Sequence, residues 1–97
     1  MVNFHSDSIN QLFDTILSLE SREECYAFFE DLCTVKEVQD MAQRLQVAVL
    51  LRKGQNYQQI AKEASVSTAT ISRVNKCLTY GSGGYKIALD RLKEEEA

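Results

Sequence analysis

The segment STATISRVNK, residues 67–76, combines short hydroxyl side chains with two cations. Its apolar spacing predicts a helix capped by Ser67, with small polar side chains on the outward face. Such a helix can approach a major groove closely and contact phosphates, base edges or thymine methyls, and its positive N-terminal end can face phosphate. The pattern therefore predicts contact with double-stranded DNA.

The charge distribution allows this chemistry in a chain whose net charge is −3. Residues 44–76 hold six cations and one anion, Glu63, so this stretch carries +5 and the rest carries −8. DNA binding requires a local basic patch rather than a basic average. A solvated face without function could carry the same charge, and the helical pattern around the cations favours the DNA interface.

Residues 57–78 have the pattern of a helix-turn-helix, two short helices around a turn at 65–67. Ala61 is the small residue where the helices meet, and Ser65 stands at a turn position that often holds glycine. The predicted apolar seam between the helices consists of Ile60, Ala64, Val66, Ile71 and Val74. A bundle hairpin without a DNA role is the alternative.

The predicted DNA-contacting residues share a position on this motif or at the end of the helix before it. Thr68, Ala69 and Thr70, followed by Ser72, are expected nearest the bases. The full predicted set is Arg52, Lys53, Gln58, Ser67, Thr68, Ala69, Thr70, Ser72, Arg73 and Lys76.

The elements that position this motif are predicted to be helices throughout. The chain has no proline and no strand pattern, so we expect one all-α domain of six helices over residues 1–97. Capping boxes at 21–24 and 34–37 open the second and third helices, Gly54 closes the third, 79–84 is a glycine-rich hinge, and 85–95 is the last helix. Two apolar faces are predicted: Ile9, Leu12, Phe13, Ile16 and Leu17 in the first helix, and Val38, Met41, Leu45 and Ala48 in the third. The second helix carries Phe28 and Phe29, which suggest core.

Other function classes find little support. The chain has one histidine, His5, and its residues assemble no nucleophile–base pair, paired-carboxylate site or phosphate-cradling loop, so an enzyme is not expected. Cys25, Cys33 and Cys77 lack the spacing of a zinc site, so no metal is expected. There is no apolar run long enough for a membrane span and no visible signal peptide, which predicts a cytoplasmic protein without a membrane partner.

Four segments, FFEDLCT, QRLQVAVLLRKG, STATISRVNKCL and YGSGGY, resemble the Trp repressor superfamily and, more closely, its YerC/YecD-type branch. The resemblance extends from LFDTILSL to ALDRLKEE. It implies a six-helix subunit in an intertwined homodimer. The first, second, third and last helices would interlock with those of the partner, and the fourth and fifth would form a DNA-reading head.

The resemblance also implies an effector slot between the third and fifth helices. Arg44 matches an arginine that stacks on the ligand ring, and Arg73 matches one that meets the ligand carboxylate. Val74 replaces a glycine and Cys77 replaces a serine, so the expected effector is an amino-acid-like molecule other than tryptophan. The predicted effector-binding set is Thr34, Arg44, Thr70, Arg73, Val74 and Cys77. The alternative is that the two arginines serve only packing or phosphate contacts.

Together these patterns predict a homodimeric, sequence-specific DNA-binding transcriptional regulator, with repression as the expected direction and no cofactor apart from the small effector. The alternative is a helical protein-interaction bundle without a DNA role.

Overall fold

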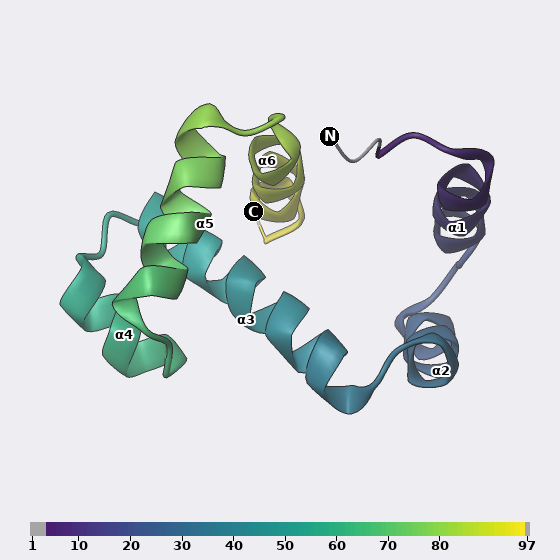
Figure 1. Cartoon of the computed structure of the whole chain (residues 1–97), viewed down its shortest axis with the longest axis horizontal. Coiled ribbons are helices and arrows are strands. Elements are labelled where there is room, and N and C mark those ends of the chain that lie inside the picture. Colours follow the sequence, from purple (N-terminus) through teal and green to yellow (C-terminus); the bar gives the residue numbers. More distant parts are fainter. Residues whose placement is uncertain (1–3, 97) are drawn as a thin grey trace. The chain divides into compact units, whose positions relative to one another are not determined.

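The computed structural model describes residues 4–96, and its regular elements are all helices (Figure 1). They are α1 (Asp7–Leu17), α2 (Arg22–Leu32), α3 (Val35–Arg52), α4 (Tyr57–Ala64), α5 (Thr68–Tyr80) and α6 (Gly84–Glu96). The prediction of six helices and an all-α fold is confirmed. The chain divides into two compact units, here called the N-terminal unit (Met1–Val38) and the head unit (Gln39–Ala97).

Side-chain caps start the helices of the N-terminal unit. The Ser21 hydroxyl accepts the Glu24 N–H at 3.1 Å, but the Glu24 carboxylate accepts the N–H of Glu20 instead of Ser21, so the predicted first capping box is only half formed. The second box is complete, because Thr34 Oγ1 accepts the Glu37 N–H at 3.1 Å and Glu37 Oε1 accepts the Thr34 N–H at 2.8 Å. The backbone hydrogen bond from Thr34, followed by the bond to its side chain, lowers the pKa of Glu37.

The N-terminal unit has no buried residue in α1 or α2. Phe28 and Phe29 pack edge to face with ring centroids 5.5 Å apart, yet both are only half-buried, so the expected core position of α2 is not reached within this unit. Leu17 keeps 81% of its surface exposed and Val35 keeps 74%. Amphipathic helices normally bury their apolar stripe, so this unit lacks a cover for much of its apolar surface.

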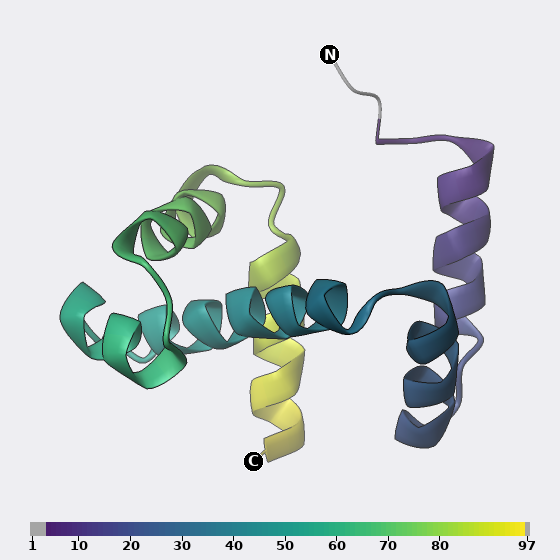
Figure 2. The same ribbon diagram turned by 60° about the horizontal axis from the view of Figure 1, so that its bottom comes forward.

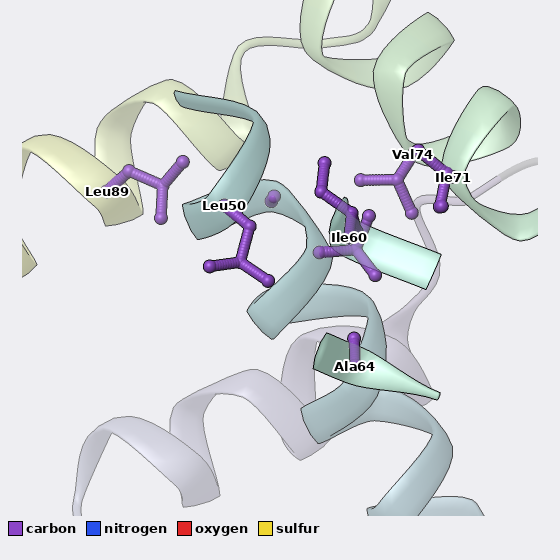
Figure 3. Packing of buried hydrophobic residues seen from close by; sticks show 8 residues of the cluster. Leu50, Ile60, Ala64, Ile71, Val74 and Leu89 are labelled. Carbon is purple, nitrogen blue, oxygen red and sulfur yellow. The ribbon is translucent and has the colours of Figure 1, made fainter. Parts of the chain in front are cut away.

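The head unit has a compact apolar core (Figure 3). Figures 1 and 2 show α4, α5 and α6 gathered around the C-terminal half of α3. Side chains from all four helices meet there: Val47, Ala48, Leu50, Ile60, Ala64, Ile71, Val74 and Leu89 are buried. Ile60 and Ile71 are fully buried, and each such aliphatic side chain contributes about 1.5–3 kcal/mol by leaving water.

The α3 helix differs from its predicted burial pattern. Of the expected apolar face, Ala48 is buried, but Met41 and Leu45 are 40% and 41% exposed. The core of the head unit is packed instead by Val47 and Leu50 together with Ala48. The helix thus carries apolar residues on two faces, and the single predicted stripe omitted Val47 and Leu50.

The ends of α3 and α5 depend on glycine. Gly54 has φ +86° and follows α3, as predicted. The α5 helix runs to Tyr80, two residues beyond its predicted end, and α6 starts at Gly84, so the break spans only 81–83. A Cβ on Gly81 would lie 2.3 Å from the Cys77 carbonyl oxygen, which excludes other residues there unless the backbone moves.

Candidate DNA-binding surface

The α4–turn–α5 segment is a helix-turn-helix whose ends are held by local hydrogen bonds. Asn56 and Gln59 form a reciprocal capping box at the start of α4, with bonds of 2.9 and 3.0 Å. Ser65 closes α4 with φ 55° and ψ 49°, the left-handed conformation that glycine adopts more easily. Ser67 caps α5 by accepting the Thr70 N–H at 3.2 Å, as predicted. The Asn56 box was not predicted, although its Asn-x-x-Gln spacing was visible in the sequence.

The predicted seam between α4 and α5 is confirmed. Ile60, Ala64, Ile71 and Val74 are buried (Figure 3), and Val66, which is half-buried, packs against this cluster. Gln43 on α3 adds a polar tie, because its Nε2 donates to the Ala64 carbonyl at 3.2 Å and to the Ser65 carbonyl at 3.4 Å. The turn is therefore fixed from two sides, by the apolar seam and by a side chain of α3.

The opposite face of α5 is open to solvent. Thr68, Ala69, Ser72, Arg73 and Lys76 are all exposed, in agreement with the outward face that their spacing predicts. Thr70 differs, because it is half-buried and its hydroxyl lies 3.2 Å from the Ser67 hydroxyl. Its side chain takes part in the helix cap, which makes it less available to a base than its neighbours. Elsewhere in the predicted set, Gln58 on α4 and Lys53 after α3 are exposed.

Arg52, also predicted to contact phosphate, has an intramolecular partner. Its Nη2 forms an ion pair with Asp90 Oδ1 on α6, and Lys86 Nζ lies 3.2 Å from Asp90 Oδ2. The hydrogen bond from Arg52, followed by that from Lys86, lowers the pKa of Asp90, so its carboxylate is ionised at neutral pH. The pairing could not be read from the sequence, because it joins residues 38 positions apart.

The predicted effector residues are distributed over both units. Arg44, Arg73 and Cys77 are exposed in the head unit, whereas Thr34 belongs to the N-terminal unit. Val74 is 2% exposed and its side chain belongs to the apolar core, where it fills space between helices (Figure 3). An effector site built from these residues stays a prediction.

Among the side chains that the structure describes, those of residues 4–92, no group of three or more His, Cys, Asp or Glu could hold a metal ion. No helix within residues 4–96 is both long and apolar enough to cross a membrane.

Comparison with known proteins agrees with this architecture. The model of the Trp repressor protein family matches residues 7–93. The chain is 58% identical over 88 residues to the protein YerC of Bacillus subtilis (strain 168), a match that covers 91% of this chain and 85% of YerC.

Solved structures agree as well. A TrpR-like protein from Eubacterium eligens superposes with a TM-score of 0.90 at 46% identity, covering 93% of each chain. A structure from Staphylococcus aureus gives a TM-score of 0.89 at 50% identity, covering 93% of this chain and 90% of the other. Sequence, fold and helix-turn-helix thus lead to one conclusion: the chain belongs to the Trp repressor family, a family of DNA-binding regulators.

Proposed function

We propose that the protein is a sequence-specific transcriptional regulator that binds double-stranded DNA through the exposed face of α5. The observation that carries the proposal is the division of α5 into two faces. Ile71 and Val74 are locked in the core, while Thr68, Ala69 and Ser72 lie open to solvent directly after the capped N-terminus. A rigid helix with short outward side chains can approach base edges closely.

The electrostatics of the head unit support the same function. Lys53, Arg73 and Lys76 are exposed cations on or beside the helix-turn-helix. They can contact phosphates and fix the register of α5 in the groove, while base contacts set the preference for sequence. The acidic remainder of the chain disfavours other orientations on DNA.

The active form in this proposal is a homodimer. The N-terminal unit leaves Leu17, Tyr26 and Val35 at least 65% exposed, which is costly for large apolar side chains unless a partner covers them. A second copy of the chain offers the same surfaces in return, as a two-fold interface requires. Two heads would then read two half-sites of one operator.

The proposed effector is a small amino-acid-like molecule other than tryptophan. Arg44 and Arg73 are exposed cations able to hold a carboxylate, as the family resemblance implies. Val74 fills the position where the family has glycine, and its burial leaves no room there for an indole ring without rearrangement.

Selection of genomic fragments by the purified protein tests the central proposal. Bound fragments should share a two-fold symmetric motif, and a duplex carrying it should bind the protein at least 10³-fold more tightly than a random duplex.

The exposed apolar surface of the N-terminal unit also favours a second candidate, a protein-interaction bundle. Fragments without a shared motif, together with no gel shift at physiological salt, would favour that bundle instead.

A further inference from the structure

An open pocket of about 270 Å³ lies in the head unit between the end of α3, the second half of α5 and the start of α6. Two leucines, Leu51 and Leu78, form its apolar lining, and Arg52, Lys86 and Asn75 form its polar lining. Pockets for drug-sized ligands start at about 300 Å³, so this pocket fits a small group. Two cations and an amide that can donate hydrogen bonds suit a phosphate.

Asp90 holds both cations of this pocket. Its Oδ1 accepts a hydrogen bond from Arg52 and its Oδ2 lies 3.2 Å from Lys86 Nζ, so one carboxylate spans the two groups. A phosphate has further oxygens with which to make the same pair of contacts. The Arg52 and Asp90 side chains are each 40% exposed, and ion pairs that are open to water stabilise a protein only weakly. Asp90 and an incoming phosphate can therefore exchange on these cations, and in the wild type the two anions share them.

We propose that this pocket binds a backbone phosphate of DNA and that Asp90 competes with that phosphate for Arg52 and Lys86. The inference rests on the proposed DNA-binding function and adds Lys86 and Asn75 to the interface. Such competition weakens phosphate attraction equally on every DNA sequence. Base contacts on α5 then account for a larger share of the binding energy, while the ratio of operator affinity to random-DNA affinity stays the same, because both affinities fall by the same factor.

The first test compares Asp90→Asn with Glu63→Gln, which makes the same change of charge at an exposed position of α4. Fluorescence anisotropy with a random duplex gives the slope of log K against log salt. Asp90→Asn should steepen this slope by up to about 0.9 for each head whose phosphate contact becomes complete, and it should raise the affinity at low salt. Glu63→Gln should leave the slope unchanged. Equal slopes for the two variants would overturn the inference.

The second test places Arg52→Met in the wild-type chain and in the Asp90→Asn chain, with circular dichroism to verify folding. In the Asp90→Asn chain, Arg52→Met should abolish the gain in slope. In the wild-type chain, Arg52→Met should change the slope less, because Asp90 already engages Arg52. Equal effects in both backgrounds would contradict competition. Binding of the wild type to the selected duplex is measured in the same experiment. If the wild type binds but the variants behave alike, only the pocket inference fails; if the wild type does not bind, the DNA-binding function itself is refuted.

Free phosphate is the other source of the same chemistry. At constant ionic strength, replacing chloride by inorganic phosphate should shift the Asn75 side-chain amide resonances of Asp90→Asn and not those of Arg52→Met. These shifts combined with a steeper DNA slope support the proposal. The same shifts with an unchanged DNA slope would assign the pocket to free phosphate and refute its role in binding DNA.

Discussion

The two units of the chain differ in how much of their apolar surface they bury. The head unit buries eight apolar residues around Ile60, Ile71 and Val47. The N-terminal unit buries none in α1 or α2, although α1 carries a regular apolar stripe. The difference indicates that the helix-turn-helix is stabilised by its own unit, while the N-terminal helices leave apolar surface exposed that the proposed homodimer would cover.

The largest expected effect comes from a cavity in the core of the head unit. Ile60→Ala should lower the free energy of unfolding by about 2–5 kcal/mol, because the side chain is fully buried and its neighbours can collapse only partly. Denaturant unfolding at several protein concentrations measures it. Lys62→Ala, at an exposed position of the same helix, is the control and should change this free energy by less than about 0.5 kcal/mol. A loss below 1 kcal/mol for Ile60→Ala would show that the head is not the stable unit.

The second prediction concerns the cover of the N-terminal unit. We expect a dimer that unfolds and dissociates in one step, so the melting temperature should rise with protein concentration. Leu17→Glu should weaken dimerisation by about 100-fold, because a charge would enter an apolar interface at each of two symmetric positions. Sedimentation measures the oligomeric state of the wild type and of Leu17→Glu. A monomeric wild type at micromolar concentration would refute the dimer.

The third prediction concerns Val74, which belongs to the core of the head unit although the family resemblance implies that its counterpart borders an effector. Fitting an indole beside it requires overpacking, which costs about 1–3 kcal/mol, a roughly 5- to 150-fold loss of affinity. Free tryptophan should therefore show no micromolar binding by calorimetry. Val74→Gly should gain affinity, provided that circular dichroism shows it folded. Micromolar binding of tryptophan to the wild type would refute the steric argument.

Local features of the fold were predictable from sequence because they depend on neighbours along the chain. The Ser67 cap, the Gly54 helix end and the α4–α5 seam all follow from spacings of a few residues. The division of α3 into two apolar faces was not predictable, because periodicity identifies apolar positions without saying which helix or which chain will cover them.

Long-range contacts at the candidate site were missed for a related reason. The Asp90 partner of Arg52 and the Gln43 tie to the turn join distant parts of the sequence, and no local spacing encodes them. The involvement of Thr70 in the cap of α5 was a local feature, and the Ser67–Thr70 spacing could have indicated it.

The smallest expected effect separates phosphate contacts from base contacts. Lys53→Ala should weaken binding similarly on all DNA sequences and flatten the salt slope by about one unit, because Lys53 is an exposed cation at the end of α3. Ser72→Ala, in the middle of the outward face of α5, should instead alter sequence preference at an unchanged slope. Anisotropy titrations on the selected and the random duplex measure both variants. If Lys53→Ala altered the sequence preference and left the salt slope unchanged, Lys53 would be a base contact and not a phosphate contact.

The most direct test of the account is the map of backbone amide shifts on adding the selected duplex to isotope-labelled protein. If α5 reads DNA, the largest shifts should fall at residues 67–73, with smaller ones near Lys53 and Gln58 and, where the pocket takes a phosphate, near Lys86. The amides of α1 and α2 should change little, because the N-terminal unit serves assembly in this account. Largest shifts in α1 or α2, or none along α5, would contradict the central claim that the exposed face of this helix is the DNA-binding surface.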